Sequence, residues 1–272
     1  MNLDKNIEEF DLVFIDLETT GLDVVTGDTI CEIGAFKVKD RKVIDRFHSL
    51  INPKRPVPQQ AYQVHKISDE ELKNAPFFED IVDKLMLFLD GSVVCAYNIG
   101  FDLGFINYQL KKMERPPIDL PAVDILSMAR DILTLPRYNL ETTARHFDID
   151  CSGNLHRALG DAAIACKVFF KLVDMLKEKK IDKLSQLLPL YGFANEIFQC
   201  CEDKKTALIK DAIGRILTLK MKFFSKENTI EEERIIPLRL LQEGKYYYLL
   251  YQKPKAGTSR IRLNRILEIA TL

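Results

Sequence analysis

Two acidic residues follow a short apolar run near the start of the chain. Asp16 and Glu18 lie in the segment D-L-E-T-T-G, directly after Leu12–Ile15. Side chains two apart on a strand point to the same face, so these carboxylates repel each other unless a cation lies between them. Hard oxygen ligands suit Mg²⁺ or Mn²⁺. The alternative is a pair of solvated surface acids, which the buried strand before them disfavours.

A third acid, Asp102, lies in A-Y-N-I-G-F-D, where an apolar strand gives way to a helix. Functional sites of α/β proteins are placed at such strand ends. Taken alone, Asp102 could equally cap the helix.

His156 and Asp161 lie in H-R-A-L-G-D-A. A separation of five residues on a regular helix turns one side chain about 140° away from the other. If both serve one site, His156 must lie in the loop before the helix and Asp161 in its first turns. A histidine near carboxylates can act as a general base because its pKa lies near neutrality. The alternative is a surface histidine beside an unrelated helix acid.

In this order and spread, the three motifs resemble those of the DEDDh exonucleases. This family has an RNase H-like fold and includes the proofreading subunits of bacterial replicative polymerases. The resemblance covers about residues 11–177. It implies that four acids bind metal and that one histidine is the general base: Asp16, Glu18, Asp102, Asp161 and His156.

The activity that this resemblance implies is 3′→5′ exonucleolytic hydrolysis with two Mg²⁺ ions, which Mn²⁺ can replace. Asp16, Glu18 and Asp161 would hold the metal that orients the attacking water, and Asp16 and Asp102 the second, beside the leaving oxygen. His156 would take the proton of the water. The expected substrate is the 3′ end of single-stranded DNA or RNA, and the expected products are nucleoside 5′-monophosphates.

Further positions are candidates for substrate binding by the same resemblance. Thr19 and Leu22 follow the first motif, where family members grip the terminal nucleotide and wedge its base. Asn98 and Phe105 flank the second motif and could face the nucleic acid. For all four, turn or core roles are equally open.

His65 lies in Y-Q-V-H-K-I-S, which looks like the His-Gly-Ile segment of the family. Lys66 replaces that glycine, and Tyr97 stands where many relatives have another histidine. Both departures concern substrate binding and leave the catalytic set intact.

The pattern of apolar residues predicts an α/β layer fold for residues 1–180, a mixed sheet flanked by helices. Expected strands are 12–15, 29–39, 43–52 and 92–96, and expected helices are 78–89, 101–113, 125–131, 139–147 and 158–177. Ser68 and Glu71 form a capping box that starts a further short helix.

The rest of the chain reads differently. Residues 181–203 are expected to form a helical linker, and 204–272 a helix followed by four strands, 215–224, 234–241, 245–252 and 260–269. This pattern predicts a small antiparallel β-barrel or sheet.

This last segment resembles a WYL domain, with R-I-I-P-L-R-L, Y-Y-L and R-I-R-L-N-R-I as its motifs. Tyr247 stands in place of the family tryptophan. The resemblance implies an Sm-like barrel that binds nucleic acid or a nucleotide-like ligand, by ring stacking and phosphate pairing. Candidates are Arg234, Tyr247, Tyr248, Arg260 and Arg262. The alternative is that the tyrosines pack a core and the arginines are solvated.

Charge is divided unevenly along the 272 residues. The net charge is −1, but residues 204–272 carry 15 Lys and Arg against 7 Asp and Glu, whereas residues 1–203 have a net charge of −9. The basic segment could hold a polyanion, although small β domains often carry many surface cations. Six cysteines without C-x-x-C spacing argue against a zinc site. The polar N-terminus and the absence of a long apolar run predict a cytoplasmic protein.

The segment from Gln186 to Tyr191 is similar to peptides that dock on bacterial sliding clamps, with its spacing off by one residue. Packing of a linker helix is the alternative. A clamp or a polymerase is thus a candidate partner. Two other functions stay open beside DNA degradation: RNA trimming, and a nucleic-acid or ligand-binding regulator with the α/β unit as its scaffold.

Overall fold

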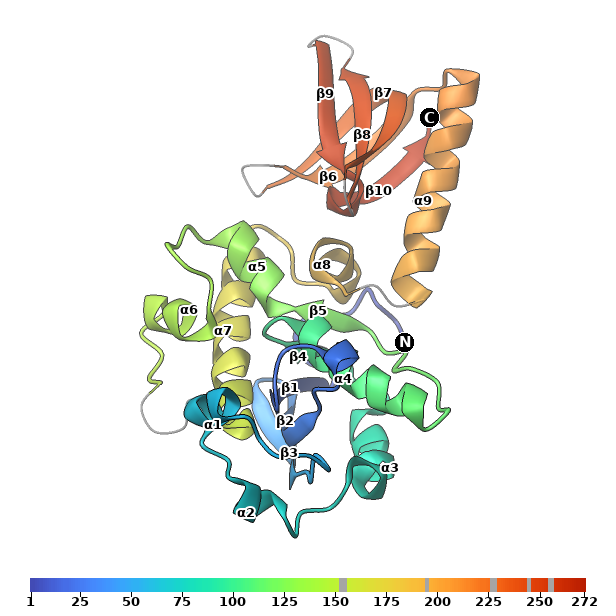
Figure 1. The fold of residues 1–272 in the computed structure, drawn as a ribbon. Helices are drawn as coiled ribbons and strands as arrows, with labels where there is room; N and C mark the ends of the chain where they lie inside the picture. The colour runs from blue at the N-terminus through green and yellow to red at the C-terminus, as the bar shows by residue number, and fades with distance from the viewer. Residues whose placement is uncertain (152–155, 194–195, 226–228, 244–245, 254–256) are drawn as a thin grey trace.

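The protein forms two sheets, each with its own helices, in a computed structural model (Figure 1). The structure describes residues 1–151, 156–193, 196–225, 229–243, 246–253 and 257–272; the side chains of 196–203, 243 and 246 are outside that description. The cysteine pair Cys200 and Cys201 therefore lies outside the described side chains. No helix built from the described residues is long and apolar enough to cross a membrane.

The first sheet has the strand order β3-β2-β1-β4-β5. Its strands are β1 (Leu12–Thr19), β2 (Ile30–Lys39), β3 (Lys42–Leu50), β4 (Val93–Ala96) and β5 (Ala122–Asp124). β2 pairs antiparallel with β1 and β3, whereas β4 runs parallel to β1 and β5. The predicted mixed sheet with the apolar run at its centre is confirmed. The three-residue β5 was not predicted, because so short a run carries no periodicity.

Helices cover both faces of this sheet. They are α1 (Gln59–His65), α2 (Asp69–Leu72), α3 (Phe78–Leu89), α4 (Ile99–Lys112), α5 (Ile125–Ile132), α6 (Leu140–His146) and α7 (Ala158–Glu178), with the 3₁₀ turns η1 (Ile7–Glu9) and η2 (Val24–Thr26). The predicted capping box of Ser68 and Glu71 starts α2. All five predicted helices are present, with ends that differ by at most a few residues.

Alternation along β1 divides the core into two layers. Val13 and Ile15 pack with α3 and α4, whereas Leu12 and Phe14 pack with α5 and α7. The Phe14 ring meets Phe169 of α7 edge-on, with centroids 5.3 Å apart. Because side chains alternate, the acids two and four positions beyond Phe14 also lie on the α7 face.

The second sheet has the order β10-β6-β7-β8-β9 and is antiparallel. It comprises β6 (Leu219–Phe224), β7 (Ile230–Glu243), β8 (Tyr246–Lys253), β9 (Gly257–Arg262) and β10 (Ile266–Thr271), preceded by α8 (Leu184–Tyr191) and α9 (Glu196–Arg215). In Figure 1 this unit lies beyond α8 and α5, away from α1 and α2.

In this unit one expected strand is divided, one expected boundary lies within a helix, and the expected sheet is present. The last predicted strand is two strands, separated by the 3₁₀ turn η3 (Leu263–Arg265). The predicted boundary between residues 203 and 204 falls inside α9. The pairings among the described residues give an open order of strands with β10 and β9 at its edges, so the sheet is shown but closure into a barrel is not.

The segment that is similar to clamp-docking peptides lies in α8, and its apolar side chains are buried. Leu187, Leu188, Leu190 and Tyr191 are at most 9% exposed and belong to the core on the α7 side of the first sheet. Peptide docking needs these side chains to be accessible. The structure therefore contradicts the clamp-peptide interpretation and supports the packing alternative.

Candidate active site

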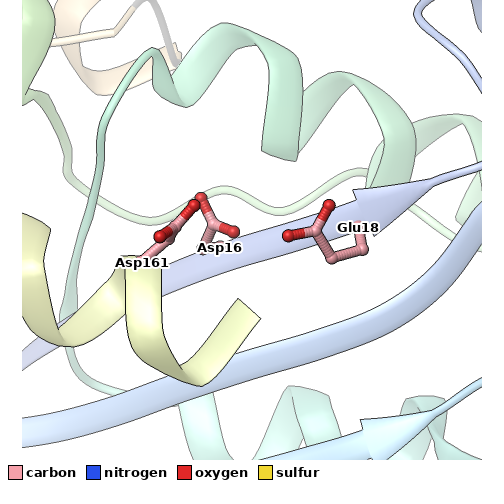
Figure 2. Close-up of side chains that lie close together, drawn as sticks. All are labelled: Asp16, Glu18 and Asp161. Atoms are coloured by element: carbon pink, nitrogen blue, oxygen red, sulfur yellow. The ribbon is translucent and has the colours of Figure 1, made fainter. Parts of the chain in front are cut away.

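Strand β1 carries Asp16 and Glu18 to the α7 face of the sheet. Each offers an oxygen that, with one from Asp161, forms a group of three ligand atoms within 4.8 Å of one another. Figure 2 shows Asp16 and Glu18 on β1 and Asp161 on the facing helix. Three oxygen donors this close together can hold one divalent cation.

The start of α7 supplies the other two residues of the third motif. His156 precedes the N-cap residue Arg157, and Asp161 lies in the first turn of the helix. His156 has a φ of 65°, a left-handed conformation, and its backbone N–H lies 3.4 Å from Asp161 Oδ1. The chain thus turns sharply before the helix, and the exposed His156 stands at the rim of the carboxylate group.

Asp102 approaches the same acids from α4 and is 2% exposed. It is not one of the three residues in the 4.8 Å group, but its charge is one of the causes that raise the pKa of Asp16. Burial raises the pKa of Asp102 well above its ordinary value, against the lowering effect of backbone hydrogen bonds from Asp102 itself and from Leu17 of β1. The structure therefore brings all four predicted acids to one region.

The electrostatics of this region favour a cation. Burial, followed by the charges of Asp102 and Asp161, raises the pKa of Asp16 well above its ordinary value. Burial and the charge of Asp161 raise the pKa of Glu18 to about 8, and burial also raises that of Asp161. Clustered carboxylates of this kind are stabilised in the ionised form by a bound cation. The donor set, made of carboxylate oxygens alone, fits a hard divalent metal ion.

The predicted substrate-contact residues divide into two groups. Leu22 is 85% exposed beside the first motif and Asn98 is exposed at the start of α4, so both can meet a ligand. Thr19 is 8% exposed and donates its hydroxyl hydrogen to the Gly21 carbonyl, a turn role. Phe105 is 3% exposed and packs on Phe101, which favours its core role.

His65 is buried at the end of α1. Its Nδ1 accepts a hydrogen bond from the Ile67 backbone N–H at 3.0 Å, so the proton lies on Nε2, near the backbone of Thr19. Burial lowers its pKa. His65 thus places the end of α1 near the end of β1.

Both departures from the family pattern have a visible accommodation. Lys66 occupies the left-handed region, with a φ of 59°, where the family has glycine. The hydroxyl of Tyr97 lies 2.7 Å from Thr143 Oγ1 and 3.0 Å from the Tyr138 carbonyl. Tyr97 therefore ties the start of α4 to α6.

Two further residues near the site, Glu32 and Asp124, were not predicted from the sequence. Glu32, 1% exposed on β2, accepts hydrogen bonds from Arg157 Nη2 at 2.8 Å and from the Ala158 backbone N–H at 3.0 Å. Burial raises its pKa, but bonds from Arg157 and His48 outweigh burial and lower it. A lone acid inside the apolar strand 30–38 was the signal that could have revealed it.

Asp124, at the end of β5, is the second residue near the site that was not predicted from the sequence. Its Oδ1 accepts from the Asn98 backbone N–H at 3.2 Å, and its Oδ2 from the Ser127 hydroxyl at 2.6 Å. Its charge also raises the pKa of Asp102. Asp124 therefore supports the turn that carries the second motif.

In the second sheet, the predicted ligand residues lie on different faces. Leu249 and Tyr251 are buried, so the alternating Tyr248 and Leu250 point to the opposite face. The cross-strand rows of that face are Arg239–Leu250–Arg260 and Leu241–Tyr248–Arg262.

The guanidinium group of Arg260 lies 4.7 Å from the centroid of the Tyr248 ring. Tyr247, 49% exposed, alternates away from Tyr248 along the strand. Arg234 is the cross-strand partner of Lys220 on β6 and lies outside the two rows. Arg239 belongs to the face but was missed by the sequence analysis.

Comparison with known proteins gives a family match over the N-terminal unit. The sequence profile of the family described as "Exonuclease" (RNase_T) matches residues 13–169. The DNA polymerase III subunit epsilon of Rickettsia conorii is 40% identical over 167 residues, which cover 59% of this chain and 73% of that protein. The PolC-type DNA polymerase III of Thermotoga petrophila is 33% identical over 187 residues, 69% of this chain but only 14% of the polymerase.

Among solved structures, the nuclease domain of 3′hExo, described as a DEDDh family member bound to rAMP, aligns with a TM-score of 0.54. The alignment covers 61% of this chain and 93% of that domain at 16% sequence identity. At this identity the likeness shows a shared fold, which here is the RNase H-like exonuclease fold of the N-terminal unit.

Proposed function

The chain belongs to the DEDDh 3′→5′ exonuclease family, and from this premise we propose that it degrades single-stranded DNA from its 3′ end. The observation that carries the proposal is the meeting of Asp16, Glu18 and Asp161 oxygens within 4.8 Å. Asp102 lies close enough to shift the pKa of Asp16. No position of the catalytic motif set is missing.

Support for DNA over RNA comes from the relatives. The two bacterial proteins compared above are named as DNA polymerase III components. The chain spans 73% of the epsilon subunit but 14% of the PolC-type enzyme, so the substrate and any association with a polymerase belong to this proposal. The alternative substrate is single-stranded RNA, which the same chemistry would hydrolyse.

We assign two Mg²⁺ ions, replaceable by Mn²⁺, to the acidic side chains. Asp16, Glu18 and Asp161 would hold one ion, and Asp16 with Asp102 the other. When bound, the ions supply a nucleophilic water and offset the charge that develops on the phosphate.

The remaining chemistry falls to side chains at the rim. His156 takes the proton from the attacking water, since it stands exposed beside Asp161 on a sharp turn. Leu22, 85% exposed, offers an apolar surface for the terminal base. The expected products are nucleoside 5′-monophosphates.

The second sheet is proposed to bind nucleic acid or a nucleotide-like ligand, as a WYL-like, Sm-like unit. Its two rows place Arg239, Arg260 and Arg262 with Tyr248 on one face. Guanidinium groups beside an aromatic ring suit phosphates and bases together. The same face would serve the regulator function if the chain were not a nuclease.

The test of the nuclease proposal is a gel time course with Mg²⁺ on 5′-labelled single-stranded DNA and RNA of matched sequence. The wild-type protein is expected to shorten the DNA from its 3′ end, and Asp16→Ala to lose turnover by at least about 10³-fold while remaining folded. Faster loss of the RNA would reassign the substrate. Equal rates in wild type and Asp16→Ala would refute the active-site assignment.

The test of the second sheet is binding of a fluorescent oligonucleotide by an Arg239→Gln/Arg260→Gln variant in EDTA. Each lost phosphate contact should reduce the slope of log affinity against log salt by about 0.7 for a single strand. Lys205→Gln, in α9, is the control for loss of a basic residue from the same unit. An unchanged slope in the double variant would exclude the face as a nucleic-acid site.

A further inference from the structure

The first turn of α7 rests on β2, the neighbour of the strand that carries Asp16 and Glu18. A Cβ atom at Gly34 of β2 would lie 2.3 Å from the Leu159 backbone nitrogen and 2.4 Å from the Ala158 carbonyl carbon. Only a glycine leaves room for the helix backbone at this distance. The backbone at the start of α7 therefore lies directly against the backbone of β2, and we call this the α7–β2 contact.

Glu32, two residues before Gly34, lies on the same face of the strand and holds this turn by hydrogen bonds. Its carboxylate accepts the Ala158 N–H at 3.0 Å, Arg157 Nε at 3.0 Å and Arg157 Nη2 at 2.8 Å. His48 Nε2 lies 2.7 Å from Oε1, the oxygen that also accepts from Arg157 Nη2. Two consecutive residues at the start of the helix are thus bound to one buried acid.

The register of the sheet places the α7–β2 contact directly beside the active site. Gly34 is the cross-strand partner of Asp16, and Glu32 is the partner of Glu18. Asp161 is one helical turn beyond Ala158, and His156 is two residues before it. The α7–β2 contact therefore determines the positions of Asp161 and His156 relative to Asp16 and Glu18 on β1.

We propose that Glu32 is a positioning residue for the nuclease reaction, which holds the start of α7 on β2 so that Asp161 and His156 meet Asp16 and Glu18. This inference rests on the roles proposed above for Asp161 and His156. Glu32 itself touches neither metal nor substrate in this assignment, since Arg157, Ala158 and His48 occupy its oxygens.

The test is Glu32→Gln, which keeps the shape of the side chain and removes its charge. Residues that orient metal ligands typically contribute about 10–100-fold to metal affinity, so Mn²⁺ affinity, measured by calorimetry without nucleic acid, should fall by at least about 10-fold. kcat on single-stranded DNA should fall by a similar factor, with KM changed by less than about threefold.

The matched control is Glu8→Gln, because Glu8 binds the opposite end of the same helix. Glu8 accepts hydrogen bonds from Lys177 of α7 at 2.8 Å and from Arg41 at 2.7 Å. Its loss should lower the melting temperature and leave Mn²⁺ affinity and kcat within about twofold of wild type. Equal losses of Mn²⁺ affinity in Glu8→Gln and Glu32→Gln would show a general stability effect and overturn the proposal.

Two further variants keep the outcome decisive. If Glu32→Gln does not fold, Arg157→Lys replaces it; this change removes the guanidinium fork but keeps the Ala158 bond, and wild-type Mn²⁺ affinity in it would overturn the proposal. Asp161→Asn separates the two proposals. If it loses Mn²⁺ binding while folded Glu32→Gln does not, only the positioning role fails. If it binds Mn²⁺ as wild type does, the metal assignment itself fails.

Discussion

At the scale of single residues, the acids of the site oppose folding in the absence of metal. Asp16 is destabilised as an anion by burial and by Asp102, Asp161, Glu18 and Glu32. A cation that binds only the folded state stabilises it by mass action. The site therefore trades stability of the metal-free protein for affinity toward metal.

This repulsion predicts opposite effects of Asp16→Asn with and without metal. In EDTA the variant should melt about 2–4 °C higher than wild type, equivalent to roughly 1 kcal/mol. Addition of Mg²⁺ or Mn²⁺ should raise the melting temperature of the wild type more than that of Asp16→Asn. Differential scanning calorimetry in both buffers measures the two shifts. A lower melting temperature for Asp16→Asn in EDTA would contradict the view that these charges repel.

The sequence allowed these acids to be predicted because each motif is local: an apolar strand, a strand-to-helix turn, and a loop before a helix. Glu32 could not be predicted in the same way. Its role depends on Gly34, Arg157 and Ala158, which meet only after β2 and α7 have packed. Likewise, burial of Phe105 and Thr19 follows from tertiary packing that no local pattern reveals.

At the scale of elements, α1 ends in a conformation that its sequence does not favour. Lys66 is left-handed at the C-cap, and its N–H bonds to the Tyr62 carbonyl. A left-handed non-glycine residue costs about 1–2 kcal/mol, and its Nζ lies 5.8 Å from the Tyr62 ring centroid, a weak compensation.

Lys66→Gly should therefore raise stability. Relief of the left-handed strain exceeds the entropy that glycine adds to the unfolded chain, about 0.4–1 kcal/mol, so the net gain should be roughly 0.5–1 kcal/mol. Urea denaturation of the two proteins measures it. Lys73→Gly, at a right-handed helix end, is the control and should lose stability.

The contacts of η1 with α7 and the β2–β3 turn give a pH-dependent contribution. Burial raises the pKa of Glu8, but hydrogen bonds from Lys177 and Arg41 outweigh it, so the pKa lies below 4.5. Arg41 also pairs with Asp174, whose pKa it lowers. A carboxyl whose pKa is lowered by folding stabilises the protein above its unfolded pKa, and this stabilisation is lost as the pH falls through the folded value.

The expected result is that Glu8→Gln lowers the melting temperature at pH 7 and that this difference shrinks as the pH falls below 4.5. Melting curves from pH 7 to pH 3 of both proteins provide the comparison. A difference that stays constant over this range would show that Glu8 acts through packing rather than charge.

At the scale of the whole molecule, a partly buried ion pair joins the two units. Arg265 of η3 donates to Asp131 of α5 at 2.7 Å and to the Phe224 carbonyl at 2.9 Å, and its guanidinium lies 4.9 Å from the Phe224 ring centroid. The Tyr191 hydroxyl of α8 donates to the same Asp131 at 3.0 Å. One acid thus joins α5, α8 and the second sheet.

Arg265→Ala should weaken this junction without touching catalysis. Removal of one partner from a partly buried ion pair is expected to cost about 1–3 kcal/mol, at the lower end because both groups keep some exposure. Hydrogen exchange should rise at η3 and at the end of β6, while the rate on a short oligonucleotide stays within about twofold of wild type. A large loss of that rate, with the N-terminal unit still folded, would show that the two units act together on short substrates.

The arrangement of the units was the part of the fold least accessible to sequence. The strand and helix patterns predicted both units, but the linker was placed at residues 181–203, whereas α9 continues to Arg215. Contacts such as Arg265–Asp131 join residues 134 positions apart, and periodicity carries no information about them. The 3₁₀ turn that divides the final strand is fixed by the same docking.

An acidic residue holds helix α5 at each end. Asp124, before its first residue, accepts a hydrogen bond from the Asn98 backbone N–H, and Asp131, near its last residue, accepts one from Arg265 of the second unit. The eight residues of α5 span about 12 Å, too short for appreciable bending. A helix this short behaves as a rigid segment that is held at both ends. A tilt of the second unit would therefore be transmitted through α5 to the turn that precedes Asp102, close to the acids proposed to bind metal.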